Sequence, residues 1–146
     1  MFRRILKSLL SFLLTVFLAT LVMLAVRAAT DGMWLFGIPS AKDVASVTLT
    51  DTEFPGAAPE YTDAESIERT LKLTSFLKYR LFNAAKENDA PVISIVWTLR
   101  DGTTREISAS RETVWWRGKA YPLKDDGFFI NLTEGIFFAP GNSGDL

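Results

Sequence analysis

One long uncharged segment near the N-terminus constrains this chain more than any other feature. After Arg3, Arg4 and Lys7, no charged residue occurs from Ser8 to Val26. The 18 residues Leu9–Val26 would form a helix of about 27 Å, close to the ~30 Å hydrocarbon core of a bilayer. The segment is apolar on all sides, whereas a helix on a protein surface is apolar on one side only. The segment therefore predicts a membrane-spanning helix.

A cleaved signal peptide is the alternative to an anchor. Val26-Arg27-Ala28 ends in a small residue, but Arg27 interrupts the site, and signal peptides carry a shorter apolar run of about 7–15 residues. We favour an uncleaved anchor in residues 1–29 that contacts the bilayer through residues 8–26. In either case, the basic start should stay in the cytoplasm. We therefore expect a single-pass protein of the cell membrane whose C-terminal domain is extracytoplasmic.

Composition removes several kinds of chemistry. The chain has no cysteine and no histidine, which excludes disulfides, thiolate nucleophiles and Cys or His metal ligands. Four of the 16 basic residues and none of the 17 acidic ones lie in the first 28 residues, so the remainder carries a net charge of −5. An acidic body disfavours nucleic-acid binding. We expect no cofactor, no metal and no nucleic-acid partner.

Glycine and proline residues mark turns and loops that divide the remaining chain into segments. Residues 30–43 are expected to form a juxtamembrane connector, in which Trp34 and Phe36 either lie at the membrane interface or cover the bottom of the domain. Residues 44–138 are expected to form the folded domain, and residues 139–146 a flexible tail. Within the domain, 44–50 alternates like a strand and 51–61 is expected to be a loop.

The clearest helix follows this loop. Thr62-Asp63-Ala64-Glu65 fits a capping box, and we expect the helix to end at Asn83. The expected apolar stripe consists of Ile67, Leu71, Thr74, Leu77 or Phe76, and Leu81.

Two hairpins are expected next. Residues 91–99 alternate like a strand, and a three-residue loop with a left-handed Gly102 pairs Ile95 with Ile107, placing both on one face. In VWWRGKAYPLK, a two-residue turn at Arg117-Gly118 pairs Trp116 with Lys119. This register turns Val114, Trp116, Tyr121 and Leu123 inward, and Trp115 outward beside Thr113 and Pro122. A three-residue loop would reverse these faces.

The final segment, 128–137, predicts a short helix started by Asp125 or Asp126, with a strand at 128–132 as the alternative. The order of elements predicts an α+β fold. We expect a mostly antiparallel sheet of about five strands, with one main helix packed on one face, after an N-terminal transmembrane helix.

No catalytic motif stands out in the sequence. Two carboxylate pairs, Asp51 with Glu53 and Asp125 with Asp126, could support acid–base chemistry, but both lie beside loop signals. We therefore predict that the protein is not an enzyme. The outward indole makes Trp115, Arg117 and Pro122 the candidate residues for contact with a partner.

Two stretches, WWRGKAYPLK and FFINLTEGIFF, resemble the C-terminal half of a family of small bacterial domains of unknown function. The similarity covers about residues 38–138. Members of that family have an N-terminal membrane segment and an extracytoplasmic domain, so the resemblance implies a bacterial origin and supports the anchor.

These observations lead to the expected function. We predict a membrane-anchored, extracytoplasmic binding module of the bacterial cell envelope, whose partner is an envelope protein rather than a cell-wall glycan. The alternative is a membrane-held inhibitor or immunity-type protein that acts on an envelope enzyme and inserts its loop at residues 54–61. A hydrolase that uses acidic residues is the third and least favoured function.

Overall fold

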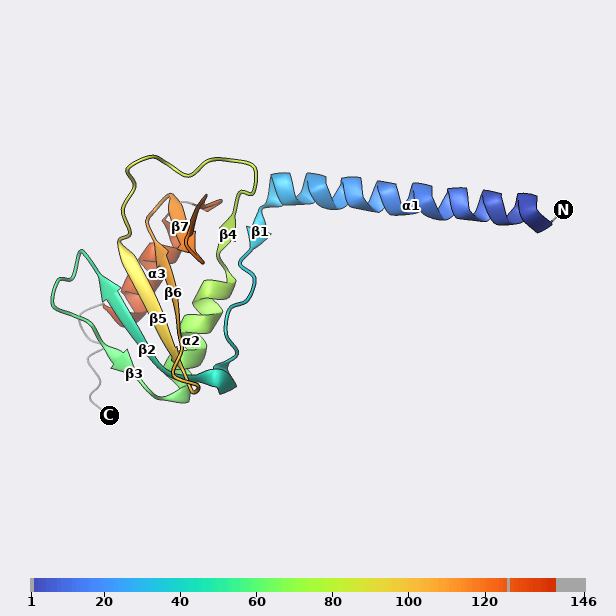
Figure 1. The fold of residues 1–146 in the computed structure, drawn as a ribbon. Coiled ribbons are helices and arrows are strands. Elements are labelled where there is room, and N and C mark those ends of the chain that lie inside the picture. Colours follow the sequence, from blue (N-terminus) through green and yellow to red (C-terminus); the bar gives the residue numbers. More distant parts are fainter. Residues whose placement is uncertain (1, 126, 139–146) are drawn as a thin grey trace.

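The computed structural model describes residues 2–125 and 127–138 (Figure 1). The chain begins with helix α1, Phe2–Asp31, which projects from the folded domain. Within Leu6–Asp31, the most apolar 18-residue stretch of this helix has a mean hydropathy of 2.7, and none of that stretch is buried. By length and composition, α1 can cross a membrane.

The domain is α+β, as predicted, and its main sheet is antiparallel throughout. Six strands lie in the order β3-β2-β5-β6-β7-β8. Their bounds are β2 Val44–Asp51, β3 Glu60–Tyr61, β5 Ile93–Leu99, β6 Thr104–Ala109, β7 Thr113–Trp116 and β8 Lys119–Pro122. The sheet has one strand more than expected because Glu60 and Tyr61, which we placed in a loop, pair with Thr48 and Val47 of β2.

Two helices, α2 (Ala64–Ser75) and α3 (Phe128–Phe137), cover the same face of this sheet (Figure 1). We call this face the inner face. It carries the fully buried side chains of Ile95 and Trp97, and the indole N–H of Trp97 donates to Thr70 Oγ1 of α2 at 3.0 Å. The hydrogen bond satisfies a polar group that burial would otherwise make costly.

Both predicted hairpin registers are confirmed. Ile95 pairs with Ile107 across a loop in which Gly102 has φ +82°. At the second hairpin, Trp116 pairs with Lys119 and Trp115 with Ala120. Arg117 and Gly118 both have positive φ, 51° and 74°, as in the type I′ turns that match the twist of paired strands.

Helix α2 differs from the prediction at both ends. Its N-cap is Asp63 rather than Thr62, and the Asp63 carboxylate accepts from the backbone N–H of Ser66 at 2.7 Å. The helix stops at Ser75, so Leu81 does not extend its stripe and is exposed. The chain instead forms strand β4, Lys78–Tyr79, because this segment pairs with strand β1, Met33–Trp34.

The predicted C-terminal helix is present as α3, but its N-cap is Gly127, with φ +73°, rather than Asp125. The other suggested start, Asp126, and the predicted tail at 139–146 lie outside the described residues.

The connector after α1 packs against the domain. After β1, Leu35 is buried, and the carbonyl of Phe36 accepts from the indole N–H of Trp116 at 3.0 Å. A short 3-10 helix, Ala41–Asp43, leads into β2. Only Gly32 separates α1 from β1, so the folded domain begins where the helix ends.

Candidate partner-binding surface

The face of the sheet opposite α2 and α3 carries a different kind of side chain. The pairing registers place on this outer face Thr48, Thr50, Ser94, Val96, Thr98, Thr104, Glu106, Ser108, Trp115 and Ala120. Most of these are small and polar, and Trp115 is the largest. Alternation along the strands separates them from the buried set of the inner face.

A groove of about 470 Å³ opens beside β6 and β7, at the margin of the sheet, and is lined by residues of both faces. It lies where the sheet steps, because β7 pairs with Ile107–Ala109 of β6 but not with Thr104–Glu106. Its lining consists of Pro91, Thr104, Arg105, Glu106, Ser108, Trp115, Trp116, Arg117 and Gly118. The lining of the groove therefore includes two tryptophans, two arginines and one glutamate.

The floor of the groove is held by hydrogen bonds between side chains. The hydroxyls of Ser94 and Ser108 lie 2.7 Å apart, and Ser108 donates to Glu106 Oε1 at 3.0 Å. Trp115 stands directly opposite Ser108 on the neighbouring strand. This chain of contacts orients the Glu106 carboxylate, which is exposed and able to accept a donor from a partner.

Arg117 reaches the groove from the type I′ turn. Its guanidinium carbon lies 5.7 Å from the centre of the Trp116 ring. The guanidinium also lies against Gly37, where an added Cβ would be 2.0 Å from one of its nitrogens. A side chain at position 37 would therefore displace the Arg117 guanidinium from this position. Arg117 thus links the groove to the connector that follows α1.

The structure brings together two of the three predicted contact residues. Trp115 is half-buried and Arg117 is exposed, and both line the groove. Pro122 lies on β8 opposite Thr113, outside the groove lining, and its carbonyl accepts from the N–H of Arg80 at 2.8 Å. Thr113, which we expected beside Trp115 on an open face, is fully buried.

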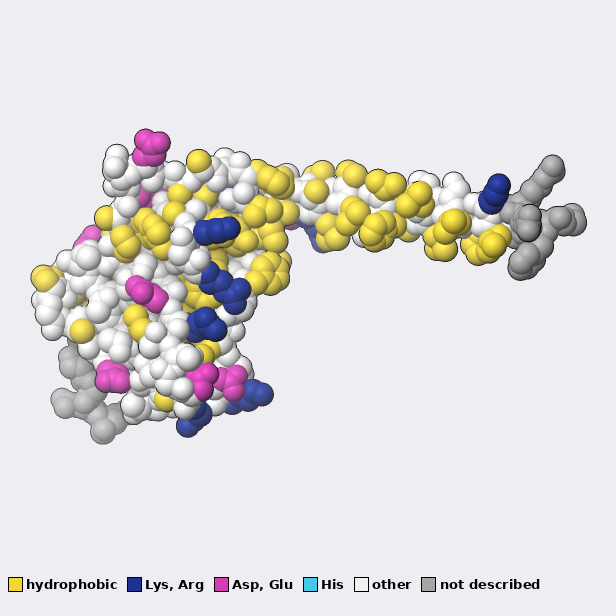
Figure 2. Space-filling view, viewed as in Figure 1, with side chains coloured by type: hydrophobic (Ala, Val, Ile, Leu, Met, Phe, Trp, Pro, Cys, Tyr) yellow, Lys and Arg dark blue, Asp and Glu magenta, His cyan; other side chains and the backbone are white. Residues whose placement is uncertain are grey.

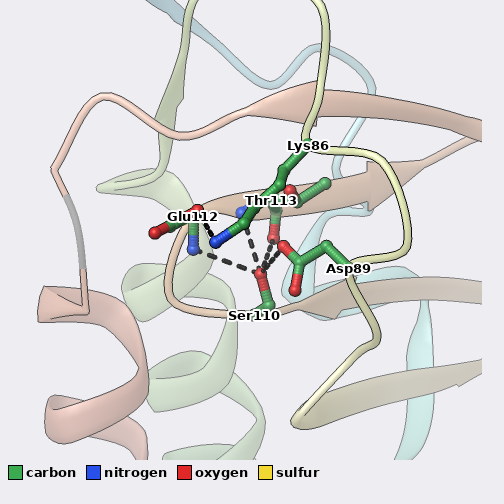
Figure 3. A network of polar contacts seen from close by, with 5 residues as sticks. All are labelled: Lys86, Asp89, Ser110, Glu112 and Thr113. Carbon is green, nitrogen blue, oxygen red and sulfur yellow. Dashed lines mark hydrogen bonds and ion pairs between the residues drawn. The ribbon is translucent and has the colours of Figure 1, made fainter.

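The burial of Thr113 results from the long segment between β4 and β5. Figure 3 shows Asp89 and Lys86 of this segment held against the β6–β7 turn. Lys86 Nζ lies 2.8 Å from Glu112 Oε2, and Ser110 donates to Asp89. Burial is the largest single effect on Asp89 and opposes its ionisation, but the hydrogen bonds that the carboxylate accepts, the one from Ser110 foremost, together with the charge of Lys86, outweigh burial. The pKa of Asp89 therefore lies below its ordinary value.

Ser110 has a structural role in this network. Its hydroxyl oxygen accepts from the N–H groups of Glu112 and Thr113 at 3.1 and 2.9 Å, while its proton is directed to Asp89 (Figure 3). A buried hydroxyl with these partners closes a turn and is not poised as a nucleophile.

A second group of polar residues gathers at the end of β2. The Asp51 carboxylate is buried, and its Oδ2 has no hydrogen-bond partner among the described residues, nor does Glu134 Oε1. Burial, with the charges of Asp51 and Glu53, raises the pKa of Glu134. These carboxylates do not line the groove. Among the described residues, no three Asp or Glu side chains are placed to hold a metal ion.

Sequence reasoning missed Arg105, Glu106, Ser108 and Pro91 as groove residues. The predicted Ile95–Ile107 register already implied that Glu106 and Ser108 share a face, so a signal for those two existed. Arg105 and Pro91 depend on the step in the sheet and on the packing of the segment before β5, which no local pattern encodes.

Comparison with known proteins adds no assignment. No family model matches the chain, and no curated protein or solved structure is significantly similar to it. The resemblance to small bacterial membrane-anchored domains therefore stays a prediction that rests on the two quoted stretches.

Proposed function

We propose that the protein is a membrane-anchored binding module of the bacterial cell envelope, with its domain on the extracytoplasmic side. The groove beside Trp115 is its recognition surface, and the partner is another envelope protein. The observation that carries this proposal is the combination of a half-buried indole with Arg105, Arg117 and Glu106 in the lining of one groove beside β6 and β7. Aromatic and arginine side chains dominate protein recognition sites.

A protein partner fits the groove better than a glycan does. Sugar rings stack on a flat, exposed aromatic side chain. Trp115 is half-buried and forms a wall of the groove, which suits an inserted side chain. An arginine at the groove, such as the exposed Arg117, suits a carboxylate on that partner, since arginine can bind one through two parallel hydrogen bonds.

The alternative, an inhibitor that inserts its loop at residues 54–61, gains less support from the geometry. Phe54 stacks on Phe138 with ring centres 5.6 Å apart, and Glu60 and Tyr61 belong to strand β3. Only the middle of the loop projects, and its one large apolar side chain is turned back onto the domain.

Orientation is tested by protease accessibility. Protease added to intact cells whose wall has been removed should remove residues beyond Thr30, because Arg3, Arg4 and Lys7 favour a cytoplasmic N-terminus. Complete protection of the domain, with cleavage only after the membrane is opened, would contradict the proposed topology.

Photo-crosslinking in living cells tests the partner. A photoreactive phenylalanine analogue replaces Trp115 or Arg117 in the full-length chain, and Thr50, exposed on β2 of the same face but outside the groove, is the matched control position. We expect both groove positions to crosslink to the same envelope protein and the control position not to do so. Adducts released only by wall-degrading enzymes would indicate a glycan partner instead. Equal crosslinking from Thr50, or none from Trp115, would refute the groove as the site.

A further inference from the structure

The side of the domain nearest α1 exposes large apolar side chains. Trp34 and Phe36 project on either side of the buried Leu35, and Phe76 and Phe128 border a hollow that Lys78 also lines. The chain leaves β4 through Leu81 and Phe82. These six side chains have exposed fractions between 42% and 69%. Figure 2 shows hydrophobic side chains gathered where the domain meets α1. Exposed apolar surface of this kind marks an interaction site.

Basic side chains lie within the same surface. Lys78 Nζ is 4.5 Å from the centre of the Trp34 ring. The Lys124 side chain lies beside Gly32, 3.4 Å from where a Cβ would stand, and the Lys124 N–H donates to the carbonyl of Lys78 at 3.0 Å. Dark blue side chains border the hydrophobic ones in Figure 2. We call Trp34, Phe36, Phe76, Lys78, Lys124 and Phe128 the anchor-side face.

The charge of this region is opposite to that of the domain as a whole. Lys78, Lys124 and Arg80 form no ion pair among the described residues, and Arg27 adds a fourth cation one turn before the end of α1. Among the described residues, the carboxylates in this region are Asp31 and Asp125. A locally basic surface on an acidic domain is suited to an anionic partner.

The connection to α1 fixes where this surface lies. Helix α1 ends at Asp31, and β1 starts at Met33 and is hydrogen-bonded to β4. Asp31 lies four positions after Arg27 on the helix, a rise of about 6 Å at 1.5 Å per residue. With α1 in a bilayer, the anchor-side face therefore lies within roughly one Debye length, ~8–10 Å, of the headgroups.

We propose that the anchor-side face binds the anionic phospholipid surface from which α1 emerges. The aromatic side chains enter the interfacial region, and Lys78 and Lys124 contact lipid phosphates. Because α1 holds the domain next to the bilayer, a contact that would be too weak to bind a free domain to the membrane is sufficient here. The domain then lies against the membrane in one orientation. This inference rests on the proposed role of α1 as an anchor.

Site-directed spin labelling of the full-length chain in vesicles tests this binding. The chain has no cysteine, so each variant carries one label. Phe128→Cys reports on the anchor-side face, and Thr104→Cys, exposed on the outer face, is the control. In vesicles containing phosphatidylglycerol, the label at 128 should collide several-fold more often with oxygen than with a water-soluble nickel chelate. The label at 104 should show the reverse preference.

Charge substitution identifies the lipid chemistry. Lys78→Gln with Lys124→Gln, or vesicles of phosphatidylcholine alone, should return the label at 128 to the behaviour of the control. Lys42→Gln with Arg100→Gln removes equal charge elsewhere and should change nothing. A label at 128 that is open to the nickel chelate in anionic vesicles would overturn the inference, as would equal protection in neutral ones. Flotation with the vesicles tests the anchor separately, and its loss would overturn both proposals.

Discussion

The two faces of the sheet are built from alternate residues of the same strands, yet they differ in almost every property. On the inner face, which α2 and α3 cover, Ile95 and Trp97 are fully buried. On the outer face, Ser94, Glu106 and Trp115 face a groove or solvent. One step along β7 separates Trp116, which is 5% exposed, from the half-buried Trp115.

This comparison teaches that residue type alone does not indicate the role of a tryptophan here. The indole rings of Trp97 and Trp116 pack in the core, and each donates its N–H to a defined oxygen, so both side chains are held in place. For the Trp115 indole, no hydrogen bond is found among the described residues. Substitutions on each face, at the turn between them and at Glu134 test how far this difference extends.

The largest expected effect is on the inner face. Trp97→Ala removes a fully buried indole and should reduce the free energy of unfolding by ~3–5 kcal/mol. Its neighbour Val96, half-buried on the outer face, provides the control, and Val96→Ala should cost well under half as much. Urea denaturation of the full-length chain in micelles measures both. Similar losses for the two variants would show that the outer face is packed as tightly as the inner one.

The adjacent tryptophans give the next comparison. Trp116→Ala should lower the melting temperature by several degrees, since ~1 kcal/mol corresponds to about 4–8 °C in a domain of this size. It also removes the hydrogen bond to Phe36 that holds the connector. Trp115→Ala should leave the melting temperature nearly unchanged while abolishing crosslinking from position 117. Equal shifts in melting temperature would refute the assignment of faces.

The turn that sets these faces is tested at Gly118. Gly118→Ala places a side chain at φ +74° and should destabilise the domain by ~1 kcal/mol. Gly135 is the matched control because it lies in α3, where an added methyl group would meet open space; Gly135→Ala should stabilise by ~0.5–1 kcal/mol. Thermal denaturation distinguishes the two, and stabilisation by both substitutions would contradict the type I′ turn.

The smallest expected effect concerns Glu134, whose raised pKa means that the folded state binds its proton more tightly than the unfolded chain does. Its contribution to stability is therefore greatest below its ordinary pKa and falls as pH rises through the raised one. Glu134→Gln should be more stable than the wild type at neutral pH. This difference in the free energy of unfolding should shrink as the pH falls to about 4, near the ordinary pKa of a glutamate. Urea denaturation of both proteins across this pH range measures it. A constant difference would exclude titration of Glu134 as the cause.

The sequence predictions were accurate where the structure depends on residues close together in the chain, and less accurate where it depends on residues far apart. The hairpin registers at Gly102 and at Arg117-Gly118 were predicted correctly because turn chemistry and strand alternation are local. The end of α2 was wrong because Leu77 and Leu81 continue the helical spacing, whereas pairing with β1 recruits Lys78 and Tyr79 into a strand. Tertiary pairing overrode the local pattern there.

The candidate site divides in the same way. Trp115 and Arg117 could be named because the turn fixes their directions. The position of Pro122 opposite Thr113 follows from the same turn, but the burial of Thr113 and the absence of Pro122 from the groove lining do not follow from the register. The groove itself results from a difference in length between β6 and β7, which appears only when the strands are paired.

The single residue between α1 and β1 has a consequence for how far this protein can reach. A domain of about 110 residues has a radius of gyration near 13 Å, so with α1 in a bilayer the groove stays within roughly 40 Å of the lipid. A long flexible linker would let the domain sample a deep volume, whereas this junction allows rotation about α1 and diffusion in the plane. Under the proposed anchoring, the search for a partner would be two-dimensional, and it would select proteins that present their surface close to the same membrane.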